Sequence, residues 1–525
     1  MTKGVFLIFL SIGLLFSCKA QQSTVWTNFV KAKETGQTPN IPDFSYAGYK
    51  YGELPIPHVS YKVFNILDFG ALPNDGMSDK KALQKAIAAA EKNKGGIVYI
   101  PKGKYIINTK EDDTTPLTIK ASNIVLKGEG AKENGSVLFF EKDLPPKNPK
   151  KLWSVPYAMV TQCKEESSKL GRVTSIAERE TFTIEIENGI KVKKGDWVTL
   201  KMKSNDLELV KKDLYPLSIE TAWSNILENG VQINERHQIT AISGNKVTFK
   251  EPIRYHINPK YGWELHSFPH LKHIGFENIL FMGNWKEDFV HHGSAKDDGG
   301  WSILKMKNLV DSWITNCSFK NVNRALSINS SAATTAMNIT IEGNKGHNAI
   351  SAGGGSTGIF MGFIDDKSGM HHSTGVGGNS TTGTVIWRSR HPANTSFEAH
   401  ASQPRCTLLD NIEGGFFAGR AGGAIKNLPN HGRYLVLWNY KETDEPEYNF
   451  EFIAKDSPYW RIVPPIIVGF HGSGTTFNER EVAIVESIGK PVQPESLYEA
   501  QLKLRLGKLP DWLIAQKKMG FRYAE

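Results

Sequence analysis

The stretch that decides the fold is FNILDFGALPNDGMSDKKALQKAIAAAEKNKGGIVYIPKGKYII, residues 64–107. It begins with an apolar run that ends at Gly70, and a cluster of turn residues follows. Apolar residues then recur at helical spacing, and Gly95-Gly96 can end that helix because glycine adopts the left-handed conformation without steric cost. An extended run, Ile97–Pro101, comes next. This order predicts an extended segment, a short helix and a strand in close succession.

The same residues resemble the first segment of the pectate-lyase-like superfamily of right-handed parallel β-helices. In that family the helix covers the N-terminal end of the solenoid, and a Gly-Gly-x-Val-x-Ile-Pro-x-Gly-x-Tyr run begins the first coils. Here that run is residues 95–105. The resemblance implies an all-β solenoid that binds or cleaves a polysaccharide. It does not name a reaction, because one fold can carry many kinds of site.

A six-residue pattern, Asn-Ile-x-[Leu/Ile/Phe]-x-Gly, recurs farther along the chain. Each copy is typical of a short strand with alternating apolar residues and a turn at its end. Repetition of one strand unit is the sequence signature of a solenoid. The copies begin at Asn123, Asn278 and Asn338, with a relaxed copy at Asn316. The 22 residues from Asn316 to Asn338 (338 − 316) give the length of one coil.

The longer spacings between copies locate insertions. Asn278 and Asn316 are 38 residues apart (316 − 278), and the excess falls on the polar loop at 285–300, which carries His291-His292. Insertions in solenoids emerge on one face, often the binding face. Asn123 and Asn278 are 155 residues apart (278 − 123), and alternating strands with a hairpin turn fill that interval. They predict an inserted antiparallel β subdomain.

The C-terminal segment has a different pattern. Residues 495–506, ESLYEAQLKLRL, carry apolar residues at helical spacing and stop at Gly507. This helix is expected to cover the far end of the solenoid or to pack along its side. The predicted organisation is a lipoprotein signal peptide (1–18), a tether and strap (19–60), the first part of the β-helix with its capping helix (61–164), the inserted subdomain (165–255), the continued β-helix with catalytic loops (256–440) and a C-terminal extension with the terminal helix (441–525).

The first residues have the features of a secretory signal. Lys3 precedes an apolar run, 5–16, that is too short to span a membrane. The run ends at Leu15-Phe16-Ser17-Cys18, which resembles a bacterial lipobox in which Cys18 becomes lipidated; ordinary signal cleavage is the alternative. The expectation is an extracytoplasmic protein anchored to a bacterial membrane through Cys18. The three remaining cysteines form neither a disulfide framework nor a metal-binding spacing.

The net charge and the composition indicate which class of molecule the protein binds. Lys and Arg number 63 and Asp and Glu 54, a net charge of +9. On an extracytoplasmic protein this excess favours an acidic polysaccharide over nucleic acid. The window 371–433 is unusual, because it holds five histidines and five arginines against three carboxylates. This excess of His and Arg over carboxylates suits cleavage by β-elimination better than hydrolysis.

Cleavage of a uronate-containing polysaccharide by β-elimination requires three groups. A cation must neutralise the uronate carboxylate so that the C5 proton becomes acidic; arginine does this bidentately, and Ca²⁺ is the alternative. A base must remove the proton, and an acid must protonate the leaving oxygen. A site rich in His and Arg supplies all three without a required cofactor. We therefore expect a polysaccharide lyase that acts on a uronate-containing polysaccharide, either sulfated or unsulfated.

The residues expected to carry this chemistry follow from the same window. Segment 397–410 is expected to belong to the active site; the alternative is that Glu398 and Arg405 form a structural salt bridge there. The loop histidines His291-His292 are further candidates. The catalytic candidates are His372, Arg388, His400 and Arg405; the substrate-binding candidates are His371, Trp387, Arg390, Arg324, Arg420, His431 and Arg433.

Two alternatives remain open. Hydrolysis needs two carboxylates at a defined separation, and the adjacent pairs Asp297-Asp298 and Asp365-Asp366 could supply them. The same aspartates are also candidate Ca²⁺ ligands. Polygalacturonases share the fold and use adjacent aspartates, but their Asn-Thr-Asp and Arg-Ile-Lys signatures are missing here. The second alternative is a glycan-binding β-helix without catalysis.

Overall fold

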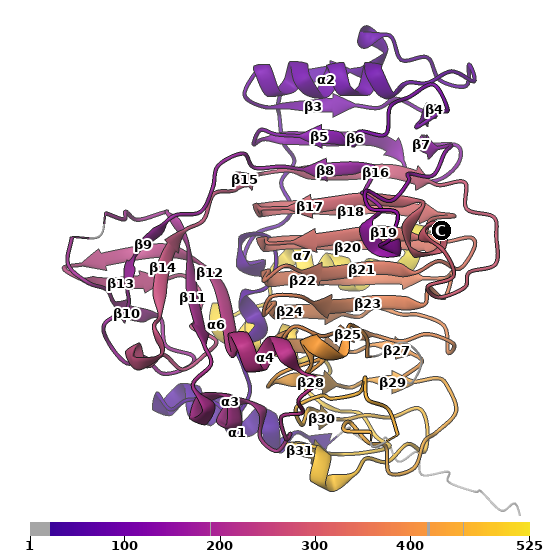
Figure 1. The fold of residues 1–525 in the computed structure, drawn as a ribbon. Helices are drawn as coiled ribbons and strands as arrows, with labels where there is room; N and C mark the ends of the chain where they lie inside the picture. The colour runs from indigo at the N-terminus through magenta and orange to yellow at the C-terminus, as the bar shows by residue number, and fades with distance from the viewer. Residues whose placement is uncertain (1–20, 190, 417–420, 455, 525) are drawn as a thin grey trace, which may run out of the picture.

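The structure is a computed structural model that describes residues 21–524 except 190, 417–420 and 455. Cys18 and Arg420 therefore lie outside the described residues. The described chain forms an all-β, right-handed parallel β-helix with a capping helix, an inserted antiparallel sheet and C-terminal helices, so the predicted fold class is confirmed (Figure 1). Within the described residues, no helix is long and apolar enough to cross a membrane.

Two parallel sheets form the solenoid, and the longer of them continues beyond the shorter at both ends. The long sheet has 15 strands, and the strands along its main path are β2 (Val63–Asn65), β3 (Gly96–Tyr99), β6 (Ile124–Gly130), β16 (Gly275–Met282), β18 (Leu309–Lys320), β20 (Ala332–Glu342), β22 (Thr357–Asp366), β24 (Thr382–Trp387), β26 (Arg405–Asp410), β28 (Leu435–Trp438), β30 (Ile466–Val468) and β31 (Ile484–Glu486). The seven-stranded sheet consists of β5 (Leu117–Ile119), β8 (Met159–Thr161), β17 (Ser302–Lys307), β19 (Arg324–Asn329), β21 (Asn348–Gly353), β23 (His372–Gly377) and β25 (Glu398–His400).

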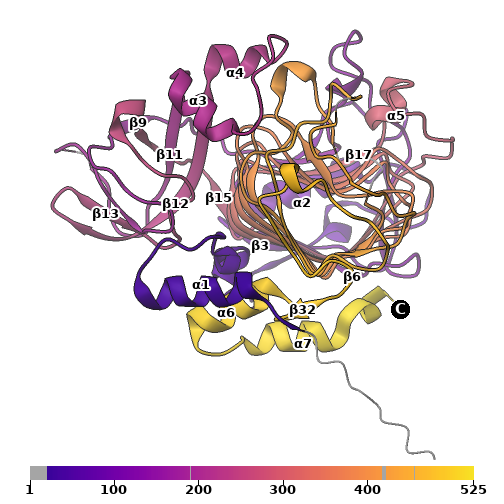
Figure 2. The same cartoon turned by 90° about the horizontal axis from the view of Figure 1, so that it is seen from below.

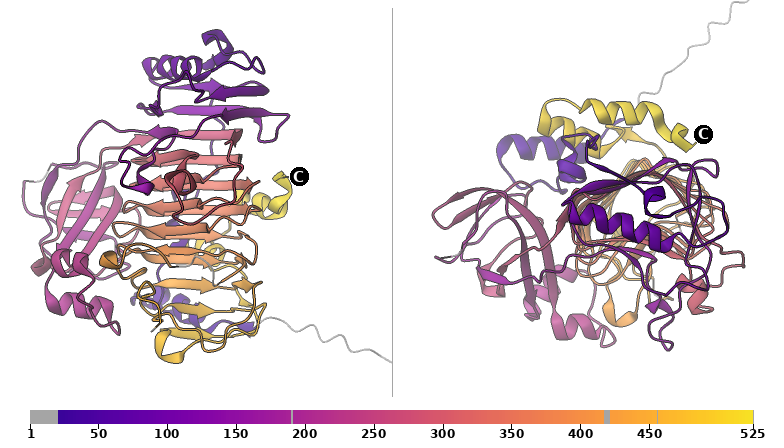
Figure 3. Two further views of the ribbon diagram at one scale, coloured as in Figure 1. Left: turned by 45° about the vertical axis from the view of Figure 1, so that its right-hand side comes forward. Right: turned by 90° about the horizontal axis from the view of Figure 1, so that it is seen from above.

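The capping helix α2 (Lys80–Lys92) lies across the open end of the solenoid, as the view from above shows (Figure 3). Its apolar face is fully buried at Leu83, Ala86, Ile87 and Ala90. These residues join the interior of the first coils in one core cluster. The helix therefore protects apolar surface and backbone groups that an uncapped end would expose.

The repeated asparagines form a corner of the coil. Asn316 and Asn338 have φ values of 52° and 58°, the left-handed region that asparagine tolerates better than most residues. Asn338 Nδ2 donates to Asn316 Oδ1 at 3.0 Å, so the corners of successive coils are linked. Strands β18 and β20 pair with Val310 opposite Ala332, the 22-residue offset that the repeat predicts (332 − 310).

The inserted subdomain is a six-stranded antiparallel sheet beside the solenoid, at the left of Figure 1. Its strands are β9 (Lys169–Arg172), β10 (Thr183–Glu185), β11 (Trp197–Ser204), β12 (Val231–Ser243), β13 (Lys246–Phe249) and β14 (Glu264–Ser267), with helices α3 (Leu207–Leu214) and α4 (Ser224–Asn229). The sheet extends past residue 255, the end predicted from the sequence, because β14 pairs with both β9 and β11. The coils resume at β15 (Leu271–Lys272).

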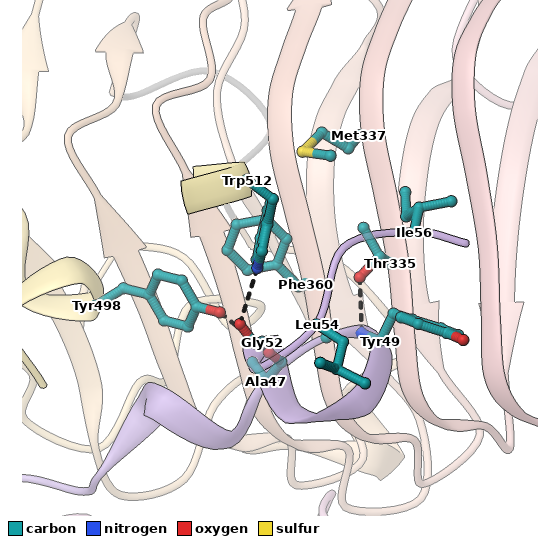
Figure 4. A pocket seen from close by; sticks show the side chains of 11 residues that line it. Ala47, Tyr49, Gly52, Leu54, Ile56, Thr335, Met337, Phe360, Tyr498 and Trp512 are labelled. Atoms are coloured by element: carbon teal, nitrogen blue, oxygen red, sulfur yellow. Dashed lines mark hydrogen bonds between the residues drawn. The ribbon is translucent and has the colours of Figure 1, made fainter. Parts of the chain in front are cut away.

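The C-terminal helices pack along the side of the solenoid. Helices α6 (Leu497–Leu506) and α7 (Asp511–Met519) lie on the opposite side from β17 in Figure 2. Residues 47–56 of the strap pass between these helices and the long sheet (Figure 4). Tyr49 N donates to Thr335 Oγ1 at 2.8 Å, and Trp512 Nε1 donates to the Gly52 carbonyl oxygen at 3.1 Å. This side of the solenoid is therefore covered, which leaves the seven-stranded sheet as the more open face.

Candidate active site

Strand register arranges polar residues in rows on the outer face of the seven-stranded sheet. Interior positions such as Met306, Ile328 and Ala352 are buried, so side chains that alternate with them point outward. Lys305, Ser327, Ser351, Gly375 and Glu398 pair in register from β17 to β25. Because the three residues in the middle of this row are small, no long side chain projects from the sheet between Lys305 at one end and Glu398 at the other. We call this surface the outer face.

Cations gather at the β17 end of the outer face. Arg324 lies 5.1 Å and Lys305 5.7 Å from the ring centre of Tyr157. Arg324 Nε donates to Ser302 Oγ at 2.7 Å, and Nη2 donates to the Val155 carbonyl oxygen at 3.0 Å. Burial, together with the charges of Lys307 and Arg324, lowers the pKa of Lys305. Among the described residues none of these three cations forms an ion pair, so they repel one another unless an anion joins them.

A cavity of about 320 Å³ lies where the inserted subdomain meets the solenoid. Lys307, Lys201 and Arg236 line it, together with Glu165. Arg236 is 7% exposed and rests 4.8 Å from the Phe268 ring centre, while its Nε and Nη1 have no hydrogen-bond partner. Burial lowers the pKa of Arg236 to about 9. Uncompensated guanidinium donors at the edge of a polar cavity favour an anionic ligand.

Histidines gather at the amino ends of β21 and β23. His291 stacks on His371 with ring centres 4.1 Å apart, and His371 meets His372 at 4.4 Å. His347 lies 5.3 Å from His372. One ligand nitrogen from each of His291, His371 and His372 lies within 4.8 Å of the other two. The polar loop identified by its excess length thus contributes a ring to the same cluster as the start of β23.

Burial favours the neutral form of His291, His347 and His371. Burial, followed by the charge of His291, lowers the pKa of His371 to about 3. Burial lowers the pKa of His347 to about 4, although its Nδ1 lies 3.1 Å from the Asp298 carbonyl oxygen. Neutral imidazoles keep a nitrogen lone pair free for a proton or a metal ion.

A carboxyl group lies beside the cluster. Glu398 Oε1 is 3.4 Å from His372 Nε2 and 3.9 Å from His400 Nε2. Burial raises the pKa of Glu398 to about 7. The His372 side chain is 7% exposed, whereas that of His400 is 56% exposed. His400 is therefore the member of this group that a large substrate can reach.

The four predicted catalytic residues do not converge, which corrects the expected single site. His372 and His400 lie together at Glu398, but Arg388 and Arg405 lie elsewhere. Arg388 is at a corner of the long sheet beneath α6, with Nε 2.7 Å from Glu499 Oε1 and Nη1 3.0 Å from Glu495 Oε1. Arg405 is buried against Asp213 of α3 with Nη1–Oδ1 at 3.2 Å. Both guanidinium groups are neutralised by acids that are distant in sequence.

The predicted substrate-binding residues also divide. His371 and Arg324 lie at the outer face. Trp387 is fully buried and donates to Glu499 Oε1 at 3.2 Å, and Arg390 forms a bidentate pair with Asp365. These two residues face the C-terminal helices, which removes them from the predicted site.

Two further predicted residues have structural contacts. His431 is fully buried, with Nε2 2.9 Å from Thr407 Oγ1. Arg433 donates from Nη2 to the carbonyl oxygens of Lys212 and Tyr215 in the inserted subdomain. Neither side chain reaches the outer face as it stands. Arg420 lies outside the described residues.

The paired aspartates do not form a two-carboxylate site. Asp365 is paired with Arg390, while Asp366 accepts from Met370 N at 3.1 Å. Asp297 accepts from Ser294 Oγ in helix α5 (Ala295–Gly299). Asp298 is fully buried and lies 3.0 Å from His292 Nδ1. Each carboxylate has its own protein partner, so the four do not assemble as shared Ca²⁺ ligands.

Several residues of the outer face were missed by the analysis of the window 371–433. Coil counting could have found Lys305, since Lys305, Ser327, Ser351, Gly375 and Glu398 pair in register at intervals of 22 to 24 residues. The missed residues are Tyr157, Lys305, Lys307 and His347 on the solenoid, and Lys201 and Arg236 in the inserted subdomain.

Comparisons with known proteins agree with the fold. Residues 63–143 match the family described as rhamnogalacturonase A/epimerase, pectate lyase-like, so the predicted resemblance to that superfamily is confirmed. Residues 369–516 match a family described as a domain of unknown function (DUF4955). The second match covers the coils that carry His371, His372 and Glu398, together with α6.

Two curated relatives from Azotobacter vinelandii match short segments. Mannuronan C5-epimerase AlgE3 is 44% identical over 71 residues, which are 13% of this chain and 4% of that protein. Alginate lyase 7 is 37% identical over 70 residues, 13% of this chain and 8% of that protein. The chain therefore spans less than a tenth of the length of either relative.

Two solved structures align over most of the chain at low identity. The tailspike gp61 of Pseudomonas phage phi297 aligns with a TM-score of 0.49 and 11% identity, over 83% of this chain and 69% of that one. An exopolygalacturonase from Thermotoga maritima aligns with a TM-score of 0.35 and 10% identity, over 85% of each chain.

Proposed function

We propose that this protein is a polysaccharide lyase that cleaves a uronate-containing polysaccharide by β-elimination on the outer face of the seven-stranded sheet. The observation that carries the proposal is the cluster of Lys305, Lys307 and Arg324, which form no ion pair within the described part of the chain and lie on the same sheet as His372 and His400. Lys305 shares its row with Glu398, and Arg324 shares its row with His372. A polyanion lying across the strands would contact both ends at once.

The dimensions of the sheet assign different parts of the substrate to the two ends. Arg324 and His372 are two strands apart, which is about 10 Å at the usual strand spacing. That distance suits Arg324 for a uronate next to the reacting one. His400 is the exposed imidazole beside Glu398, and we assign it the removal of the C5 proton.

The local relatives support acidic polysaccharide as the substrate class. The relatives are named as mannuronan C5-epimerases and an alginate lyase, and the match over 63–143 is to a family described as pectate lyase-like. We extend this chemistry to the present chain as part of the proposal. A glycoside hydrolase is less well supported, because Asp365 and the other paired aspartates already have protein partners.

The test is incubation with pectin, alginate, ulvan and glycosaminoglycans while ultraviolet absorbance is followed. Elimination leaves an unsaturated uronate that absorbs, whereas hydrolysis leaves a reducing end without that chromophore. We expect absorbance to rise with one or more substrates. H400A should reduce the rate by about 10² to 10⁴-fold, the usual contribution of a general base. H58A is the control, because His58 is exposed and belongs to the strap.

Each other outcome would identify a different function. Cleavage without the chromophore would replace the lyase with a hydrolase. Binding without cleavage on any substrate would support a glycan-binding protein. Equal rates for H400A and H58A would remove His400 from the mechanism.

We further propose that the protein is anchored through a lipidated Cys18 outside the cytoplasm of a bacterium. The lipobox-like sequence Leu15-Phe16-Ser17-Cys18 supports this location. Expression of wild type and C18A with a radiolabelled fatty acid tests it. Label in the wild-type protein and not in C18A is the expected result, and equal labelling would exclude a lipid at Cys18.

A further inference from the structure

The histidine cluster raises a question about the reacting uronate. Its carboxylate must be neutralised before the C5 proton can leave. Arg324 lies two strands from His372, about 10 Å, and Arg388 and Arg405 are paired with other residues. The side chains around the cluster include imidazoles, the buried Glu398 and Lys345, whose charge helps to lower the pKa of His371. The two arginines predicted to neutralise that carboxylate, Arg388 and Arg405, therefore supply no charge where His400 would act.

We propose that His291, His371 and His372 bind a divalent transition-metal ion of the zinc type. Their ligand nitrogens lie within 4.8 Å of one another. Zinc holds imidazole nitrogens at about 2.0 to 2.1 Å, so tetrahedral ligands are separated by about 3.3 Å. Modest rotation of the His291 ring closes that difference, because His291 is exposed and lies on the loop before α5.

The ligand type selects the metal. Imidazole nitrogen suits zinc, copper, nickel and iron, whereas Ca²⁺ prefers six to eight oxygen ligands. Three protein ligands leave a fourth position open, which is the arrangement of catalytic zinc sites. Lowered pKa values at His291 and His371 agree with this assignment, because a ligand imidazole must be neutral.

The surroundings of the cluster resemble the outer shell of a metal site. Asp298 is fully buried, and its carboxylate lies 3.0 Å from Nδ1 of His292. The His292 ring in turn packs 3.8 Å from that of His291. Glu398 lies 3.4 Å from Nε2 of His372. A carboxylate placed like Glu398 fixes the orientation of a ligating histidine, whereas Asp298 acts only through the neighbouring His292 ring.

The role of the ion rests on the proposed function. At the open position it would bind the carboxylate of the reacting uronate, while His400 lies near Glu398 on the next strand. The metal would thus supply the charge that Arg388 and Arg405 do not supply.

The binding test needs no substrate. Full-length protein is dialysed against a chelator and titrated with Co²⁺, whose visible absorption reports coordination by imidazole, and zinc content is measured by mass spectrometry after reloading. We expect one equivalent in wild type and H58A. H371A and H372A should lose it. H291A should weaken binding at least tenfold, and because His291 is exposed this variant keeps the solenoid intact.

Absence of saturable Co²⁺ and Zn²⁺ binding in wild type would overturn the site. Binding as tight as wild type in H291A, H371A and H372A would overturn it as well. Circular dichroism and the thermal midpoint of the metal-free variants check that each has folded. Failure of the site can be told from failure of the lyase proposal. Full elimination activity in metal-free protein would overturn the metal inference alone, whereas metal binding without unsaturated products on any uronate substrate would overturn the lyase alone.

Discussion

Arg405 of β26 and Asp213 of α3 form a buried ion pair that joins the solenoid to the inserted subdomain, with Nη1–Oδ1 at 3.2 Å and Nη2–Oδ2 at 3.2 Å. Each side chain is 3% exposed. The Tyr255 ring covers the guanidinium group at 4.9 Å, and the Tyr255 hydroxyl donates to Asp213 Oδ1 at 3.1 Å. An arginine that the sequence suggested for catalysis thus fixes the position of one domain on another.

The first prediction concerns this pair. R405M should lower the free energy of unfolding by about 3 to 5 kcal/mol, because it leaves the Asp213 carboxylate buried without its partner. The double variant R405M/D213L should recover most of that loss, since neither charge remains. Urea unfolding of both variants measures the difference. A loss of less than 1 kcal/mol in R405M would contradict a buried structural pair.

The second prediction concerns the docking of the C-terminal helices. Arg388 occupies a left-handed corner with φ 45° and holds Glu499 of α6. R388A should destabilise that contact by ~2 kcal/mol, the usual contribution of a hydrogen bond to a charged group. Amide hydrogen exchange across α6 and α7 should accelerate, while exchange in β18 and β20 should not.

R480A is the matched control, because Arg480 is an exposed arginine away from α6. Protection of α6 that is equal in R388A and R480A would show that Arg388 does not hold the helix. Lys517 also contacts Glu499 at 3.0 Å, so the helices should remain folded on average in R388A.

The third prediction concerns acid stability through His431. Burial lowers the pKa of His431 to about 4, below the ordinary value near 6.5 in an unfolded chain. Because the folded pKa is depressed, the contribution to stability is complete above pH 6.5 and is lost as the pH falls toward 4. Between pH 8 and 4.5 this residue alone should cost about 2.5 kcal/mol.

H431Q cannot titrate in this range and should therefore lose less stability over the same interval. Urea unfolding of both proteins at pH 8 and 4.5 gives the two differences, and other buried histidines cancel because both proteins contain them. Parallel losses in the two proteins would place the titration elsewhere.

The fold followed from local signals, whereas the site depended on partners far away in sequence. Gly95-Gly96, the asparagine corners and the 22-residue spacing act within one or two coils, so a single sequence carries them. The count of His and Arg in 371–433 marked an unusual window. It could not reveal that Asp213, Asp365 and Glu499 neutralise three of the arginines, because those carboxylates come from other coils, the insert or the terminal helix.

The histidines behaved differently because their contacts follow the coil. His371 directly precedes β23 and His372 begins it. The excess length of the loop at 285–300 placed His291 on one face of the solenoid. Register then brought these rings together. The lysines of β17 were missed because the charge count did not extend back to them, although the spacing of 22 to 24 residues links their strand to His372.

The fourth prediction concerns the cations of the outer face. K305A/K307A should weaken binding of an acidic polysaccharide by roughly tenfold or more at low salt, about 1 kcal/mol for each charge removed. The difference from wild type should shrink as salt rises, because exposed charges separated by more than the Debye length, about 8 Å at physiological ionic strength, are screened. Affinity electrophoresis with alginate or pectin at several salt concentrations measures both effects.

The control for this prediction is K94A, which removes an exposed lysine just after the capping helix α2, away from the outer face, and should leave binding unchanged.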